Sequence, residues 1–122
     1  MFGNTRAFSG FSVDDIPTAR QFYGETLGIN VSEANGMLTL HLAGDRPTLI
    51  YPKPDHVPAT YTILNFPVED IEAAVAELTS RGVVFDKLDT VDDQVIFRKG
   101  GPLIAWFKDP AGNVLSVLEQ SV

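Results

Sequence analysis

The stretch Phe11-Ser12-Val13-Asp14-Asp15-Ile16-Pro17-Thr18-Ala19 returns 55 residues later as Phe66-Pro67-Val68-Glu69-Asp70-Ile71-Glu72-Ala73-Ala74, with five of nine positions identical. In each copy a phenylalanine and a valine alternate at the end of a predicted strand, and an aspartate follows as a helix N-cap. An isoleucine then opens the apolar side of a helix. The repeat therefore predicts two copies of one strand-helix-strand unit, laid end to end.

Apolar residues recur at spacings of three and four beyond each cap, which is the pattern of a helix with one buried face. They are Ile16, Ala19, Phe22, Tyr23 and Leu27 in the first copy, and Ile71, Ala74, Val75 and Leu78 in the second. Gly28 and Gly82 are expected to end these helices, because glycine adopts the left-handed conformation at a helix terminus without a steric penalty.

Three further strands are expected in the first copy, over Asn30–Ala34, Met37–Leu42 and about Thr48–Tyr51. Asn35-Gly36 separates the first two of these strands and fits a type I′ hairpin turn, since both residues tolerate positive φ. The segment Pro52–Pro58 contains three prolines and is interpreted as the linker between the copies.

The second copy is expected to follow the same order, with strands over Ala59–Phe66, Val83–Asp86, Leu103–Phe107 and Val114–Glu119. The turn Asp109-Pro110-Ala111-Gly112-Asn113 joins the last two. Lys87–Gly101 has no counterpart in the first copy and is predicted to be a long hairpin, with a lid as the alternative. The modules then cover about residues 5–52 and 59–120 of a single domain, residues 1–122.

The composition excludes several classes of protein. The 122 residues are 44% hydrophobic, which is enough for one core. Cysteine is absent, so disulfides, thiolate metal sites and a cysteine nucleophile are excluded. No long apolar run and no basic leader precede the first predicted strand, so we expect no membrane span and a cytoplasmic location. A net charge of −7 argues against nucleic acid and anionic membranes as partners.

Several motifs in combination resemble the vicinal oxygen chelate superfamily, which includes glyoxalase I, extradiol dioxygenases, fosfomycin-resistance transferases and bleomycin-resistance proteins. They are Phe11–Ile16, Ala19–Tyr23, Leu27–Ile29 and the closing Trp106–Asn113. The resemblance covers nearly the whole chain and is poorest at Lys87–Gly101. It implies an α+β fold of two tandem βαβββ modules, which form a curved, U-shaped mixed sheet with helices on the outer face. The two halves, often with a second subunit, would enclose a ligand cavity.

The resemblance also implies four positions for metal ligands. Phe8 lies five residues before Val13, at a place where histidine is common, and Ile63 occupies the equivalent place in the second copy. Ser116 lies seven residues after Asp109, where metal-dependent members have a glutamate. The fourth position belongs to the last strand of the first copy, which offers no carboxylate or imidazole there: Leu49, Ile50 and Tyr51. We therefore predict no catalytic metal, no cofactor and a more apolar pocket.

The predicted ligand-binding residues combine these family positions with the large aromatic side chains near them. They are Phe8, Tyr51, Tyr61, Ile63, Trp106 and Ser116. Tyr51, Tyr61 and Trp106 are suited to stacking on a flat ligand, with the filling of a core or a subunit contact as the alternative.

No catalytic residue is assigned, because neither histidine has a convincing carboxylate partner in the sequence. His41 alternates with Leu40 and Leu42 and is predicted to be a solvated or hydrogen-bonded strand residue. His56 falls in the proline-rich linker. Glu119 is interpreted as a surface residue on the opposite face from Ser116. Arg98 and Lys99 could clamp an anionic group, with a solvated hairpin tip as the alternative.

The sequence thus favours a metal-independent protein that binds a small organic ligand and sequesters an antibiotic as bleomycin-resistance proteins do, acting as a homodimer. The alternative is a glyoxalase-like lyase or isomerase that uses an unrecognised metal or base. A third hypothesis is a non-catalytic interaction module, for which we expect a solid core without a cavity.

Overall fold

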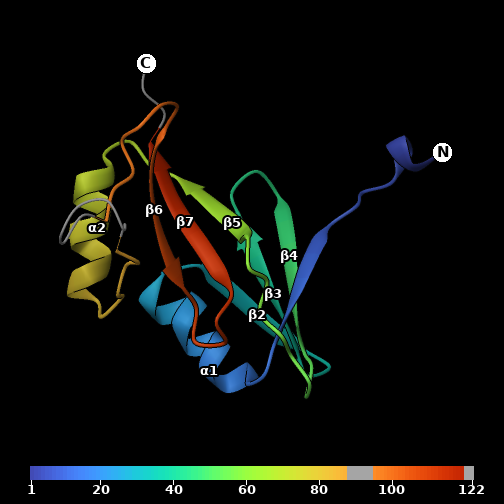
Figure 1. Ribbon diagram of the computed structural model, residues 1–122. Coiled ribbons are helices and arrows are strands. Elements are labelled where there is room, and N and C mark those ends of the chain that lie inside the picture. The colour runs from blue at the N-terminus through green and yellow to red at the C-terminus, as the bar shows by residue number, and fades with distance from the viewer. Residues whose placement is uncertain (88–94, 120–122) are drawn as a thin grey trace. The chain divides into compact units, whose positions relative to one another are not determined.

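The computed structural model of the chain describes residues 1–87 and 95–119. It divides into two compact units, Met1–Val57 and Pro58–Val122. Each unit has its own mixed β-sheet and its own helix (Figure 1), so the predicted α+β class is confirmed. Among the helices of the described residues, none combines the length and apolar character needed to cross a membrane.

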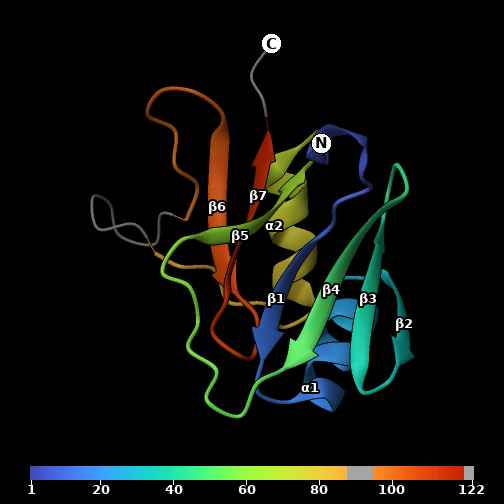
Figure 2. The same cartoon turned by 90° about the vertical axis from the view of Figure 1, so that its right-hand side faces the viewer.

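The first unit contains a four-stranded sheet with the order β1-β4-β3-β2 (Figure 2). The strand β1 runs parallel to β4, and the other neighbours are antiparallel. A short 3₁₀ turn at Phe2–Asn4 precedes them. Their bounds are Ser9–Val13 for β1, Asn30–Ala34 for β2, Met37–Leu42 for β3 and Arg46–Pro52 for β4. The bounds of β2 and β3 agree with the prediction, while β4 is longer at both ends.

The helix of the first unit begins where the sequence predicts but changes type part-way. The Asp15 carboxylate accepts a hydrogen bond from the Thr18 amide at 3.0 Å, which confirms the N-cap of α1 (Ile16–Gln21). The chain then forms a π-helix, η2 (Phe22–Thr26), instead of the continuous helix that we expected. This wider turn accompanies full burial of Tyr23, whose ring packs 5.8 Å from that of Phe11.

A tight turn joins β2 and β3 as predicted. Asn35 has φ of 56° and Gly36 has φ of 75°, so both residues are left-handed. These are the conformations that a type I′ hairpin requires.

One face of the first sheet is buried against α1 and η2. The side chains that build this core are at most 3% exposed: Val13, Ala19, Tyr23, Leu38, Leu40 and Ile50. Because side chains alternate along a strand, the residues between them occupy the other face. We call the face turned away from a unit's own helix its distal face. In the first unit it carries Ser12, Ser32, His41, Leu49 and Tyr51.

The second unit contains a three-stranded sheet with the order β5-β7-β6, in which β5 is parallel to β7 and β6 is antiparallel to it. The strands are Thr62–Pro67 for β5, Leu103–Lys108 for β6 and Val114–Glu119 for β7. The helix α2 (Ile71–Ser80) lies beside β6 and β7 (Figure 1). Its predicted N-cap is confirmed, since Asp70 accepts from the Ala73 amide at 3.1 Å.

The predicted strand Val83–Asp86 is wrong, because only an isolated bridge between Phe85 and Phe107 forms there in the described residues. The strand β5 begins at Thr62 rather than Ala59. Of the insertion Lys87–Gly101, residues 88–94 lie outside the described part, and so do Asp89, Asp92, Asp93 and Gln94. Further along, Phe97 and Ile104 exchange backbone hydrogen bonds of 2.7 and 3.2 Å, so this stretch pairs with β6.

The second sheet also has one apolar face against its helix, formed by Ala105, Phe107, Leu115 and Val117, which are at most 3% exposed. Its distal face is set by the strand register. It carries Thr62, Asn65, Trp106, Lys108, Val114 and Ser116. In each unit, therefore, the helix covers a mainly apolar face, while the distal face combines polar side chains with aromatic and aliphatic ones such as Trp106 and Leu49.

Candidate functional site

The distal face of the second unit is hollowed, and two predicted ligand residues line the hollow. Its volume is about 480 Å³. The lining residues come from the start of the unit, from β5 to β7 and from the segment before β6: Pro58, Ala59, Thr60, Tyr61, Thr62, Asp86, Trp106, Lys108, Gly112 and Val114. Asp86 and Lys108 supply one acidic and one basic group, and the aromatic rings come from Tyr61 and Trp106.

The indole of Trp106 has a fixed orientation in this hollow. Its Nε1 donates a hydrogen bond to Thr62 Oγ1 at 3.2 Å. Because Trp106 is on β6 and Thr62 on β5, this contact spans β7 between them. The centre of the Phe97 ring lies 6.1 Å from that of the indole. The Trp106 side chain is half-buried, so part of its hydrogen-bonded indole remains accessible to a ligand.

Tyr61 is much more exposed than Trp106. Its side chain is 71% exposed and lies just before β5, at the rim of the hollow. Ile63 lies at the irregularity in the pairing of β5 with β7, between Thr62 and Leu64, and is half-buried.

Ser116 is fully buried, and its hydroxyl donates a hydrogen bond to Asn65 Oδ1 at 2.7 Å. Asn65 itself is exposed. No sequence motif singles out Asn65, because its position opposite Ser116 depends on the register of β5 and β7.

The other two predicted ligand residues lie in the first unit. Phe8 is 63% exposed immediately before β1, and Tyr51 is 38% exposed on the distal face of β4. Neither lines the hollow of the second unit. The structure therefore brings Tyr61 and Trp106 together, while Phe8 precedes β1 and Tyr51 is on β4, both in the other unit.

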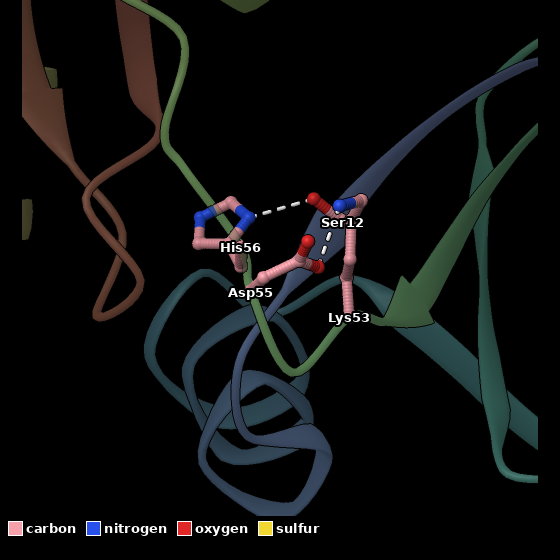
Figure 3. Close-up of polar contacts among 4 residues, drawn as sticks. All are labelled: Ser12, Lys53, Asp55 and His56. Atoms are coloured by element: carbon pink, nitrogen blue, oxygen red, sulfur yellow. Dashed lines mark hydrogen bonds and ion pairs between the residues drawn. The ribbon is translucent and has the colours of Figure 1, made fainter.

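A Ser–His contact forms in the first unit that the sequence did not predict. Ser12 Oγ lies 2.6 Å from His56 Nδ1, and the two residues are 44 positions apart (Figure 3). Asp55 does not complete a triad with them, because it pairs with Lys53 Nζ at 2.6 Å. The hydrogen bond from Lys53, with a backbone hydrogen bond and the ammonium charge, lowers the pKa of Asp55.

His41 behaves as predicted for a strand residue. It is exposed on the distal face of β3 and lies 2.8 Å from Ser32 Oγ through its Nε2.

Glu119 and Arg98 each contact a residue of the helix α2. Glu119 is on the opposite face from Ser116, as expected, but the interpretation as a surface residue is wrong. It is half-buried and accepts a hydrogen bond from the Ile71 amide at 2.8 Å, which satisfies a free N–H group at the start of α2. Arg98 lies 3.5 Å from Glu72 on that helix, in a partly exposed ion pair.

A second hollow, of about 850 Å³, lies in the first unit beside α1, η2 and β2. An ion pair between Arg20 and Glu33, at 3.4 Å, belongs to its lining. It contains none of the predicted ligand residues.

A family model describes almost the whole chain. The match is to the Glyoxalase/Bleomycin resistance protein/Dioxygenase superfamily and covers residues 7–117. The chain belongs to this superfamily. The resemblance inferred from the sequence motifs is thereby confirmed.

Solved structures of members of the glyoxalase superfamily and of related proteins share the fold. TnmS3, an antibiotic binding protein from Streptomyces sp. CB03234, has a TM-score of 0.70 and 26% identity over 97% of this chain and 98% of that chain. A glyoxalase family protein from Enterococcus faecalis has a TM-score of 0.71 and 25% identity over 98% and 100%. The fosfomycin resistance protein FosX from Mesorhizobium loti, at 12% identity and a TM-score of 0.67 over 98% and 94%, shares the fold. No curated protein matches.

The positions that the family resemblance assigns to the ligands of metal-dependent members hold Phe8, Ile63 and Ser116 here. None of these side chains is a good ligand for a divalent ion. Within residues 1–87 and 95–119, no group of three or more histidines and carboxylates is arranged to hold a metal. The donor set of the described residues therefore does not fit the catalytic metal of those members.

Proposed function

We propose that this protein binds a small, flat organic molecule of the antibiotic type without a metal and without transforming it. The observation that carries the proposal is the hollow of about 480 Å³ beside the tethered Trp106 indole. Its volume falls in the range of small-molecule sites, which are concave and combine apolar walls with a few polar groups. The likeness to an antibiotic binding protein at 26% identity supports the same class of ligand.

The proposed ligand contacts within the second unit are Tyr61, Ile63 and Trp106, with Ser116 beneath them. Phe8 and Tyr51 are proposed contacts from the first unit. Phe8 and Tyr51 are 63% and 38% exposed, so both rings are accessible to another molecule. We further propose a cytoplasmic homodimer.

The chain offers a direct probe of this function, because Trp106 is its only tryptophan. Titration with a panel of aromatic antibiotics, including bleomycin, should change the Trp106 emission in a saturable way with one ligand per chain. The ligand should be recovered unchanged by mass spectrometry. Trp106→Ala should weaken binding about tenfold when it is measured by calorimetry, since buried aromatic anchors dominate such sites. Phe2→Ala, which removes an exposed aromatic ring in the other unit, is the matched control.

Absence of saturable binding across the panel would contradict the proposal, and conversion of a bound ligand would replace it with an enzymatic function. Native mass spectrometry of protein purified without chelator or affinity tag reports the remaining points. We expect a dimer without stoichiometric metal, and a bound divalent ion would show that the metal-independent proposal is wrong.

A second candidate function is a glyoxalase-like lyase or isomerase, and one observation favours it. His56 and Ser12 form a short contact on the distal face of the first unit, and histidine is a common general base. Assays with glutathione hemithioacetal, with and without zinc, nickel or manganese, test this candidate. We expect no turnover. Turnover that disappears in His56→Ala but survives in His41→Ala would establish the enzyme.

A further inference from the structure

Three residues of the second unit form one row across the distal face of its sheet. The register places Asn65 of β5 opposite Ser116 of β7, and Ser116 opposite Trp106 of β6. Neighbouring strands are about 4.8 Å apart, so the backbones of Asn65 and Trp106 are about 10 Å apart on the same face. That separation is comparable to the length of a two- or three-ring aromatic molecule.

The middle residue of the row cannot itself touch a ligand. Ser116 is 0% exposed, and its hydroxyl donates to Asn65 Oδ1 at 2.7 Å. This hydrogen bond decides the orientation of the Asn65 amide. With Oδ1 turned toward Ser116, the Nδ2 group points the other way and presents its N–H donors on the exposed side of the side chain.

These donors have no acceptor on the described residues, since the hydrogen bond from Ser116 is the only side-chain hydrogen bond of Asn65 found within residues 1–87 and 95–119. In contrast, the Trp106 N–H already has its partner in Thr62. The row therefore combines an aromatic surface whose polar group is satisfied with an amide whose donors are oriented and available.

We infer that Asn65, oriented by Ser116, is the hydrogen-bond donor that selects the ligand, and that the ligand is a planar aromatic molecule carrying an acceptor oxygen such as a carbonyl, carboxylate or sulfonate. This inference rests on the proposed binding function and names its ligand class. In this arrangement the rings lie on Trp106 and the oxygen accepts from Asn65 Nδ2. Ser116 is a positioning residue, and it stands where metal-dependent members of the superfamily have a glutamate.

A matched pair of fluorescent probes tests the inference. 8-Anilinonaphthalene-1-sulfonate and N-phenyl-1-naphthylamine share the same ring system, and only the first carries acceptor oxygens. We expect both to bind the wild-type protein with one site per chain. Asn65→Ala should weaken binding of the sulfonate about tenfold and that of the neutral dye less than twofold, because a hydrogen bond to a charged group contributes at least this much.

Two further variants test whether binding depends on the N–H donors of Asn65 and on their orientation by Ser116. Asn65→Asp replaces the donors by a carboxylate of the same shape and should weaken sulfonate binding more than Asn65→Ala does. Ser116→Ala removes the orienting hydroxyl and should weaken it about threefold, again without affecting the neutral dye. Asn30→Ala, on the exposed edge strand of the first unit, is the control and should change neither affinity.

Each outcome is decisive. If Trp106→Ala weakens both dyes while Asn65→Ala changes neither, the binding function stands and the inference is wrong. If Lys108→Ala abolishes the preference for the sulfonate and Asn65→Ala does not, the ammonium selects the ligand and the inference is also wrong. An equal loss for both dyes in Asn65→Ala overturns it as well. Wild-type protein that binds neither dye in a saturable way contradicts the proposed function together with the inference.

Discussion

The distal faces of the two units use different chemistry on similar sheets. In the first unit, polar contacts there pair serine with histidine, Ser12 with His56 and Ser32 with His41. In the second unit the contacts are Trp106 with Thr62 and Ser116 with Asn65. The faces against the helices, by comparison, are mainly apolar in both units, although the buried Thr48 of the first unit lies 3.2 Å from Ser9 Oγ there through its Oγ1. Packing constrains the helix-facing side of each sheet, and the chemistry that distinguishes the units is on the distal side.

The β2–β3 and β6–β7 turns also differ in the side-chain contacts that stabilise them. Asn35 and Gly36 connect β2 to β3 through their left-handed backbone conformations. The connection from β6 to β7 also has a left-handed residue, Gly112 with φ of 87°. In addition it contains the buried carboxylate of Asp109, which accepts from the amides of Ala111 and Asn113 at 3.0 and 2.8 Å and from Asn113 Nδ2 at 3.0 Å. The second turn thus adds a buried side chain to the backbone conformation that both turns share.

The largest loss of stability is expected from substitutions in the two cores, where the units are most alike. Tyr23 and Phe107 are both fully buried and both contact a second aromatic ring, at 5.8 Å for Phe11 and 5.3 Å for Phe85. Tyr23→Ala and Phe107→Ala should each lower the free energy of unfolding by about 3–5 kcal/mol in urea denaturation. Phe8→Ala, which is exposed, should change it by less than about 0.5 kcal/mol. A small effect in only one unit would show that the cores are not equivalent.

The next largest loss of stability is expected in the hairpins, and it should differ between the two turns. Asp109→Ala leaves the buried donors around it without their acceptor and should cost about 2–3 kcal/mol. Gly36→Ala should cost only about 1 kcal/mol, because no atom lies within 4 Å of the added methyl group and the left-handed backbone is the single source of strain. Thermal unfolding followed by circular dichroism measures both. Equal losses would mean that the buried carboxylate has no special role.

A smaller loss of stability is expected when the helix caps are removed. Asp15→Ala and Asp70→Ala should each cost about 1 kcal/mol, since each removes one N-cap hydrogen bond. The helix α2 has a second acceptor in Glu119, which α1 lacks among the contacts found in the first unit. Glu119→Ala should therefore lower stability by a similar amount, and Glu119→Gln, which keeps an acceptor oxygen, should recover most of it. Loss of stability that Glu119→Gln does not recover would point to the charge of Glu119 instead.

The smallest effect on stability is expected from the ion pair between Lys53 and Asp55 in the first unit. The hydrogen bond from Lys53 lowers the pKa of Asp55 in the folded protein, so the ionised carboxylate favours folding above about pH 4. That contribution is lost as the pH falls through the lowered pKa. Chemical shifts of the Asp55 side chain, followed by NMR during acid titration, should give a midpoint below the ordinary pKa of an aspartate. In Lys53→Met the midpoint should rise to the ordinary range, and an unchanged midpoint would contradict the assignment.

Much of the fold could be predicted because its signals are local. The caps at Asp15 and Asp70 depend on residues three positions away, and the turn at Asn35-Gly36 depends on its own φ angles. The predicted bounds of β2, β3 and β7 agree with the structure for the same reason. The π-helix at Phe22–Thr26 could not be predicted, because it arises where the buried Tyr23 ring meets Phe11 on β1.

The candidate site was predictable only in part. Tyr61 and Trp106 were recognised as large aromatics near the family positions, and the structure places both at one hollow. Asn65 and the Ser12–His56 contact were missed, and Glu119 was misinterpreted. In each case the partner lies 44 to 51 residues away in the sequence.

By itself the sequence determined the family, the order of the main elements, the helix caps and the first hairpin. These depend on residue identity, short spacing and backbone preference. Only the tertiary structure decided which side chains meet: Ser116 with Asn65, Thr62 with Trp106, and Ser12 with His56. The reason is that such contacts require a strand order and a register, and a register is fixed by the packing of the whole sheet rather than by any one strand.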